Sequence, residues 1–301
     1  MTTFTINPTT TYSLRESAEF GFGGRAPDAF DGVMRLAFCL DGYTEQVGVE
    51  VRQNTAGTVH GSVHGVGADR VDAVRAQVAR VLSLDQDGSG FGDVGIRDPL
   101  IGRLQEVAPG LLPPLFYSPY EAAVWSVLSA RRPAKQMAQV RTQLSERHGR
   151  VFELAGRLLA ALPTPEQLLR VTEFPGLTED KIQRMHGIAR KAIAGTLDVD
   201  RLRHIGPQAC DEDMQRLKGI GPFYASLITI RAVGFTDVLP ADEPMLLELV
   251  GLHYGVDGPV GRARFEEIAE PWRPYRTWAS VLIRAASSRI GVVGAGRNRA
   301  G

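Results

Sequence analysis

The spacing of hydrophobic and polar positions changes near residue 97, and this change divides the chain into two predicted regions. Residues 33–40 and 45–53 are predicted β-strands, and the second alternates with a period of two; residues 58–65 alternate as well. Residues 69–84 show the helical period instead, because their apolar side chains fall on one stripe. Two or three antiparallel strands and one packed helix predict a small α+β domain over residues 1–96.

From residue 97 onward the pattern predicts helices alone. Ser118 and Pro119 begin one of them, with Glu121 placed to complete a capping box, and residues 164–167 repeat the device. A helix over residues 178–194 carries basic residues on its outer face, which we interpret as a solvated face rather than a DNA contact. We predict an all-α region over residues 97–290 and a disordered tail rich in glycine and arginine over residues 291–301.

Composition narrows the functional classes. The chain has 301 residues, of which 44% are hydrophobic and 23% charged, as is usual for a globular protein. Its 34 basic and 34 acidic residues cancel, which argues against a protein that coats nucleic acid by bulk charge but permits a local basic face. Cys39 and Cys210 are far apart, so we expect reduced thiols and neither a zinc nor an iron–sulfur site. We expect no signal peptide and no membrane span.

The most informative stretch runs from Leu217 to Ala225 and reads Leu-Lys-Gly-Ile-Gly-Pro-Phe-Tyr-Ala. Two glycines around one apolar residue suit a tight turn between helices, and Pro222 suits a first helical position. Residues 223–233 are apolar on nearly every side, so the second helix should be buried. The helix–hairpin–helix is predicted at about residues 207–234. Its exposed amides could bind a phosphate, although many such turns merely join helices.

Asp242 follows this hairpin by about one helix length. A carboxylate at that place could serve catalysis, or it could cap the next helix, because Pro244 follows two residues later. Both roles could hold together, and the spacing does not choose between them.

The hairpin followed by this aspartate resembles the helix-hairpin-helix DNA glycosylase superfamily. Two further stretches, Arg97-Asp98-Pro99-Leu100 and Pro271-Trp272-Arg273-Pro274-Tyr275, are similar to its DNA-3-methyladenine glycosylase II branch. The resemblance covers about residues 97–286, with its motifs in order. It implies a glycosylase fold for the helical region and, for the N-terminal domain, half of a TATA-binding-protein-like fold.

The resemblance implies that Asp242 is the catalytic residue and that the hairpin binds DNA through Lys218, Gly219, Ile220, Gly221 and Ala225. It also implies a monovalent cation held by the backbone carbonyls of Gln215, Leu217 and Ile220. Bifunctional members carry a nucleophilic lysine where this chain has Phe223. An aromatic ring cannot form a Schiff base, so we expect base release by water without strand cleavage.

A flipped base needs a pocket, and aromatic side chains would stack a cationic one. The candidates for this pocket, each of which could instead pack in the core, are Phe223, Tyr224, Tyr120 and Trp278. Val281 and Leu227 replace a tryptophan and a tyrosine of the resembled enzymes, which implies a different or narrower range of bases.

The turn after the first helix of the helical region is the place where relatives fill the gap left by the flipped base. Here it reads Ser129-Ala130-Arg131-Arg132-Pro133-Ala134-Lys135, and Arg131 aligns with the wedge residue. Arginine can fill a gap or grip a phosphate, so we favour DNA contact by Arg131 and Arg132 over a plain exposed basic turn.

The sequence thus predicts a monofunctional DNA glycosylase of base excision repair that leaves an abasic site after releasing an alkylated or modified purine. The alternative is a non-catalytic or weakly active protein that binds damaged DNA. We expect double-stranded DNA as partner, no cofactor, a monomer, and a cytoplasmic location, at the nucleoid if the source is bacterial.

Overall fold

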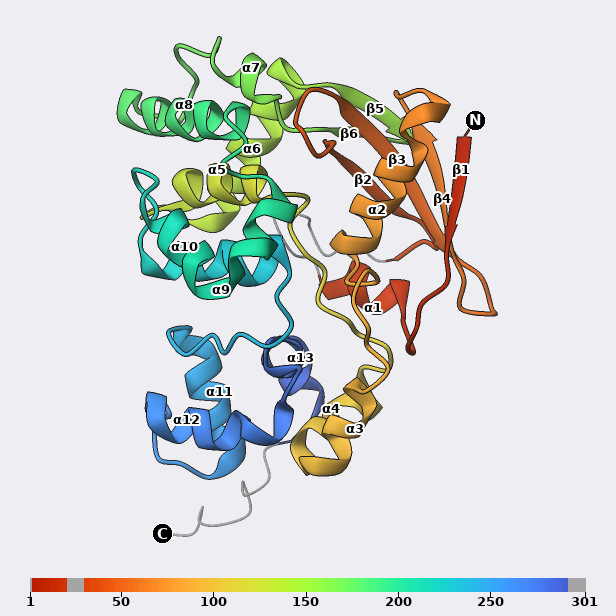
Figure 1. Ribbon diagram of the computed structural model, residues 1–301, viewed down its shortest axis with the longest axis vertical. Coiled ribbons are helices and arrows are strands. Elements are labelled where there is room, and N and C mark those ends of the chain that lie inside the picture. Colours follow the sequence, from red (N-terminus) through yellow and green to blue (C-terminus); the bar gives the residue numbers. More distant parts are fainter. Residues whose placement is uncertain (1, 21–29, 292–301) are drawn as a thin grey trace, which may run out of the picture.

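The computed structural model describes residues 2–20 and 30–291, and these fold into a sheet region and two helical lobes (Figure 1). The strands are β1 Thr2–Ile6, β2 Met34–Cys39, β3 Gln46–Gln53, β4 Val59–His64, β5 Val151–Leu154 and β6 Arg157–Ala160. The helices of the N-terminal third are α1 Leu14–Phe20, α2 Val71–Val81, α3 Phe91–Arg97 and α4 Pro99–Val107. The later α-helices are α5 Pro119–Ser129, α6 Ala134–His148, α7 Pro165–Leu168, α8 Glu179–Ile193, α9 Val199–Gln215, α10 Pro222–Ile228, α11 Pro244–Tyr254, α12 Arg262–Ala269 and α13 Arg276–Ala286.

The N-terminal sheet is antiparallel, with strand order β1-β4-β3-β2. The three strands predicted from the sequence are β2, β3 and β4, and Val49 pairs with Val63 in their register. Strand β1 was not predicted; it adds to the free edge of β4 and buries Phe4 and Ile6. Glycine at position 61 makes room for this edge, because a Cβ there would overlap the Phe4 ring. Helix α2 has the predicted apolar stripe, with Val74 and Val78 fully buried.

The region predicted to be all-α, residues 97–290, also contains two strands, so this prediction is wrong in part. Strands β5 and β6 form an antiparallel hairpin inside it, turning at Ala155 and Gly156 with left-handed φ angles of 44° and 76°. The hairpin packs on β2 and β3, where Phe152 lies so close to Gly48 that a Cβ there would be 2.8 Å from its ring. Strands of four residues carry too little periodicity to be recognised, so only this tertiary contact reveals them.

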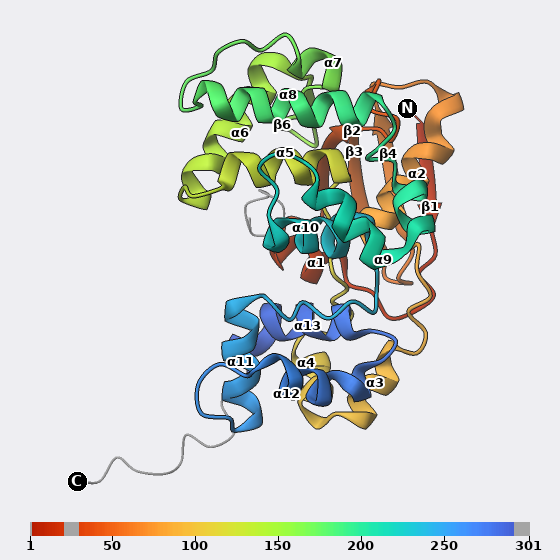
Figure 2. The ribbon, with the colours of Figure 1, turned by 60° about the vertical axis from the view of Figure 1, so that its left-hand side comes forward.

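Helices α5 to α10 form the lobe beside the sheet, and α3, α4 and α11 to α13 form the second lobe (Figures 1 and 2). The core of the second lobe is continuous with that of the sheet. Helix α3 starts at Phe91, before the boundary predicted at residue 96, and it packs on α4 and on the short 3-10 helix Glu270–Trp272 from the C-terminal third. The predicted tail lies outside the described residues from 292 onward.

Arg97 and Asp98, from the first of the two stretches that carried the resemblance, bind the second stretch directly. Arg97 donates to the carbonyls of Pro271 and Arg273, both at 2.8 Å. Buried Asp98 caps α4 and accepts hydrogen bonds from Trp272 Nε1 at 2.7 Å and from the Tyr254 hydroxyl at 2.5 Å. These motifs are therefore parts of one joint between α4 and the C-terminal helices.

Among the described residues, no helix combines the length and the apolar character needed to cross a bilayer. Cys39 and Cys210 are both buried and free. Burial raises the pKa of each thiol, so both stay protonated near neutral pH. This matches the expectation of reduced thiols.

Of the two predicted capping boxes, one is complete and the other is half formed. Thr164 and Gln167 form the complete predicted capping box, and the Ser118 hydroxyl accepts from the Glu121 amide. The Glu121 side chain does not return to Ser118 as predicted. It accepts from the Cys39 amide at 3.2 Å and from Arg141 at 2.9 Å, because a buried carboxylate is better satisfied by a guanidinium.

Candidate active site

The predicted helix–hairpin–helix is present, built from α9, a tight turn and α10. Helix α9 is kinked at Gly206, where φ is 81°, so its second half matches the predicted start near residue 207. In the turn, the Ile220 amide donates to the Leu217 carbonyl at 3.0 Å, and Gly219 has a φ of 96°. Only glycine adopts this conformation freely, and a Cβ there would also lie 2.9 Å from Arg184 Cδ. Pro222 occupies the first helical position as predicted.

The turn exposes Lys218 and Gly221 and half-buries Gly219. Ile220 and Ala225 are also predicted to contact DNA, but they do not lie at the surface. Both side chains are buried, and the Ala225 amide donates to the Gly221 carbonyl at 2.9 Å within the helix. They anchor the hairpin, because an exposed turn needs apolar side chains to hold it on the lobe. DNA contact by the five hairpin residues stays a prediction, and of these Lys218, Gly219 and Gly221 lie at the surface.

The backbone carbonyls of Gln215, Leu217 and Ile220 stay a prediction as ligands of a monovalent cation. Leu217 already accepts one hydrogen bond, from Ile220, and a carbonyl oxygen has two lone pairs. Within the described part of the chain, no cluster of three or more His, Cys, Asp or Glu side chains could hold a metal ion.

The buried helix after the hairpin continues to Val233, as predicted, but its last five residues form a π-helical turn, Thr229–Val233. Gly234, with a φ of 87°, ends it. Such π turns alter the direction of side chains within a helix and are frequent near functional sites. Here the turn carries Arg231, whose guanidinium is buried, donates to the Pro114 carbonyl at 2.6 Å and lies 5.5 Å from the Phe20 ring centroid.

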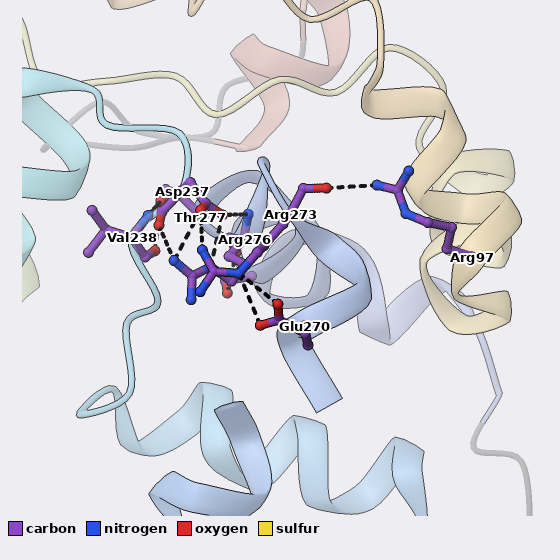
Figure 3. Close-up of polar contacts among 8 residues, drawn as sticks. Arg97, Asp237, Val238, Glu270, Arg273, Arg276 and Thr277 are labelled. Carbon is purple, nitrogen blue, oxygen red and sulfur yellow. Dashed lines mark hydrogen bonds and ion pairs between the residues drawn. The ribbon is translucent and has the colours of Figure 1, made fainter. Parts of the chain in front are cut away.

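The segment that leads to Asp242 is fixed to the start of α13 by a polar network around Asp237 (Figure 3). The Asp237 carboxylate accepts from Arg276 Nε at 2.8 Å and from Arg273 Nη1 at 2.9 Å. Next to it, the Val238 amide and carbonyl both bond to the Thr277 hydroxyl, at 3.0 and 2.7 Å. These contacts hold the polypeptide between α10 and α11 against α13, and so set where Asp242 lies.

Asp242 does not cap the following helix. The N-cap of α11 is Glu243, whose Oε2 accepts from the Leu246 amide at 2.6 Å. The capping role is therefore excluded for Asp242, and its catalytic role stays a prediction. The Asp242 carboxylate is 67% exposed and accepts two hydrogen bonds from Arg262 Nη2, at 2.7 and 2.8 Å. Sequence reasoning did not identify Arg262, because 20 residues separate it from Asp242.

A cavity of about 250 Å³ lies beside Asp242, close to the lower end for small-ligand sites. Its walls come from the end of α1, the α10 helix with its π turn, the start of α11, and α13. The residues of the described chain that line it are Phe20, Phe223, Ser226, Leu227, Ile230, Arg231, Pro240, Asp242, Glu243, Leu246, Ser280, Val281 and Arg284.

Four predicted residues, Asp242, Phe223, Leu227 and Val281, therefore meet at this cavity. Phe223 is 46% exposed. Phe20 was missed: it ends a short helix of the N-terminal region, and no local pattern in the sequence connects it to a site more than 200 residues away. With Phe223 it supplies the aromatic part of the wall, where Leu227 and Val281 are aliphatic.

Three predicted pocket residues lie elsewhere. Tyr120 is fully buried, and its hydroxyl donates to the Pro163 carbonyl at 2.9 Å. Trp278 packs edge-on against Phe91, with ring centroids 5.4 Å apart. Tyr224 shares a hydrogen bond of 3.0 Å with Ser129 Oγ. The first two are core residues because large rings stabilise helix contacts most when no water reaches them.

The basic turn after α5 stands beside the hairpin, since Ser129 bonds to Tyr224 of α10. Arg131 and Arg132 are exposed, and Arg131 has a left-handed φ of 57°. Lys181 of α8 binds the carbonyls of Leu128 and Ala130 at the end of α5. Desolvation, followed by the charges of Arg132 and Arg184, lowers the pKa of Lys181. One residue of the face predicted to be solvated therefore supports this turn.

No protein-family model matches the chain. It is 24% identical over 210 residues to the DNA-3-methyladenine glycosylase of Bacillus subtilis, covering 67% of this chain and 68% of that protein. It is 28% identical over 211 residues to the probable bifunctional transcriptional activator/DNA repair enzyme AlkA of Mycobacterium tuberculosis; the match covers 68% of this chain but only 41% of that longer protein.

Solved structures share the fold. The 3-methyladenine DNA-glycosylase from Archaeoglobus fulgidus superposes with a TM-score of 0.75 and 20% identity, covering 94% of this chain and 97% of that one. The DNA-3-methyladenine glycosidase from Bacillus halodurans superposes with a TM-score of 0.54 and 24% identity, covering 66% of this chain and 89% of that one. The resemblance inferred from the motifs is confirmed.

Proposed function

We propose, from this kinship with the DNA-3-methyladenine glycosylases, that the chain is a monofunctional DNA glycosylase. It would hydrolyse the N-glycosidic bond of a flipped alkylated or modified purine and leave an abasic site in double-stranded DNA. One observation carries the proposal: Asp242 stands on the wall of a largely apolar cavity that the helix after the hairpin turn helps to form.

Breaking a glycosidic bond builds positive charge on the sugar, in a transition state resembling an oxocarbenium ion. A carboxylate beside the sugar stabilises that charge and can orient or deprotonate the attacking water. Asp242 is exposed enough to reach a nucleotide and is not used as a cap. The base itself would enter the cavity between Phe20 and the apolar side chains of Leu227 and Val281.

The chemistry of the lining supports hydrolysis by water. Among the described residues that line the cavity there is no lysine. By the motif resemblance, Phe223 matches the position of the nucleophilic lysine of bifunctional members. The two cationic residues of the wall, Arg231 and Arg284, carry guanidinium groups, which form no Schiff base. Cleavage of the strand by the protein is therefore not expected.

A second candidate function is a non-catalytic protein that binds damaged DNA. The observation that favours it is the Arg262 guanidinium, which neutralises the charge of Asp242. Leu227 and Val281, in place of aromatic residues, are compatible with it as well.

Base release from a methylated duplex tests the proposal. We expect free methylated purine and abasic sites in equal amounts, with strand breaks only after alkali, because water and not an amine attacks the sugar. Strand breaks formed without alkali would show that the protein has a lyase step, contrary to this prediction. Intact duplex binding without release from any of several alkylated purines would support the non-catalytic alternative.

The basic turn should contribute DNA affinity. We expect Arg131→Ala and Arg132→Ala each to weaken duplex binding several-fold and to reduce the slope of log K against log salt by about 0.9, the value for one lost phosphate contact. The measurement is fluorescence anisotropy across a salt series.

Arg190→Ala is the matched control, since Arg190 is an exposed arginine near the far end of α8. If Arg190→Ala weakened binding as much as the two turn variants, the effect would reflect net charge rather than contact by the turn.

A further inference from the structure

The pair between Arg262 and Asp242 engages both oxygens of the carboxylate. One nitrogen, Arg262 Nη2, lies 2.7 Å from Asp242 Oδ1 and 2.8 Å from Oδ2. Arg262 is the first residue of α12, and its side chain is 57% exposed. On its other side lies Glu266, with Nη1 and Oε1 3.9 Å apart. Nothing buries the guanidinium, so this is a surface ion pair, a kind held weakly and easily exchanged.

This arrangement conflicts with the proposed chemistry. With the guanidinium in place, the negative charge that should stabilise the cationic sugar is offset, and both carboxylate oxygens already share the Arg262 donor when a water approaches. A second cation beside an oxocarbenium ion also raises its energy. Arg262 must therefore leave Asp242 before the bond breaks.

The DNA supplies a destination for Arg262. A nucleotide whose sugar lies at Asp242 brings its two flanking phosphates to the same place, and arginine binds phosphate well through its fork of donors. The surface around the start of α12 is open, because Gly261, Arg262, Ala263 and Arg264 are all exposed.

We propose that Arg262 is a releasable counter-ion of the catalytic carboxylate. It masks Asp242 in the free protein and transfers to a DNA phosphate when the damaged nucleotide is seated, which exposes the carboxylate only on DNA. This inference rests on the proposed function for the role of Asp242, but the exchange itself can be measured by binding alone.

The test is a double-mutant binding cycle on a duplex containing a tetrahydrofuran abasic analogue, which can be seated but not cleaved. Arg262→Ala is compared in the wild type and in Asp242→Asn. In the wild type, the free energy gained from the phosphate contact of Arg262 is partly spent on breaking its pair with Asp242. In Asp242→Asn there is no such pair to break. We therefore expect Arg262→Ala to lower the affinity for the duplex by a factor about two- to fivefold larger in Asp242→Asn than in the wild type. The salt slope should fall by about 0.9 in both backgrounds.

Arg264→Ala is the matched control, as an exposed arginine of the same helix paired with Glu267 at 2.7 Å. It should cost the same affinity in both backgrounds. Equal losses for Arg262→Ala in the two backgrounds, or an unchanged salt slope, would overturn the proposal, because the guanidinium would then stay on Asp242 or never meet the DNA.

Kinetics provide the second readout. Arg262→Ala should mainly raise the duplex concentration that gives half the maximal single-turnover rate, and should leave the rate at saturation nearly unchanged. A larger loss in the rate at saturation would overturn the release, since it would show that Arg262 acts in the transition state.

The two proposals fail separately. If the binding cycle showed the expected coupling but no alkylated purine were released, the glycosylase proposal would be wrong and the transfer of Arg262 to a phosphate would stand. If base were released but the cycle showed no coupling, the glycosylase proposal would stand and the transfer of Arg262 would be wrong. If the wild type did not bind the duplex at all, both proposals would be wrong.

Discussion

Asp242→Asn should abolish base release while leaving the fold intact. We expect the single-turnover rate on a methylated duplex to fall by about 10²–10³-fold, which corresponds to the roughly 3–4 kcal/mol that one preorganised electrostatic contact gives a transition state. Asparagine keeps the shape of the side chain but carries no charge to stabilise the sugar cation. Because the Asp242 carboxylate is exposed and caps no helix, the free energy of unfolding should change by less than about 0.5 kcal/mol.

The matched control is Asp257→Asn, which removes an exposed carboxylate from the segment that follows α11. Its rate should equal that of the wild type. If Asp242→Asn kept a rate within tenfold of the wild type, the catalytic charge would have to come from another group. Glu243 would be the first to examine, because it lines the same cavity.

Asp98→Ala should produce the largest loss of stability among the changes considered. The Asp98 side chain is buried, with 5% of the residue exposed, and receives hydrogen bonds from Trp272, Tyr254 and the Leu100 amide. Burial and the neighbouring carboxylate raise the pKa of the Tyr254 hydroxyl, which keeps it protonated as a donor. Alanine would leave these buried donors unpaired and remove the N-cap of α4. We expect a loss of about 3–5 kcal/mol in the free energy of unfolding.

Urea unfolding followed by circular dichroism measures this loss. Asp93→Ala is the control, because Asp93 is an exposed carboxylate in the preceding helix, and it should change stability by less than about 0.5 kcal/mol. Asp98→Asn should fall between the two, since its amide retains one acceptor oxygen. A loss below about 1 kcal/mol for Asp98→Ala would mean that the joint between α4 and the C-terminal helices contributes little.

Several features of the site could be predicted from the sequence because each depends on neighbouring residues. Gly219 requires a left-handed conformation, Pro222 begins a helix, and the valines of β3 recur at every second position and so share one face. The motifs around Arg97 and Trp272 were recognised in order, although their physical purpose, a shared joint, appeared only in the fold. Short elements such as β5 and β6 escaped prediction because four residues define no period.

Local pattern thus determined the hairpin turn, three of the four strands of the N-terminal sheet and the position of Asp242 along the chain. Tertiary structure decided what surrounds that carboxylate: Phe20 comes from the N-terminal region, Arg262 from α12, and Glu243 displaces Asp242 as the cap. It also moved Tyr120 and Trp278 from the predicted pocket into the core. The physical reason is that turns and caps depend on bonds between residues close in sequence. The partners of an exposed charge and the walls of a cavity depend on packing between segments that meet only when the chain is folded.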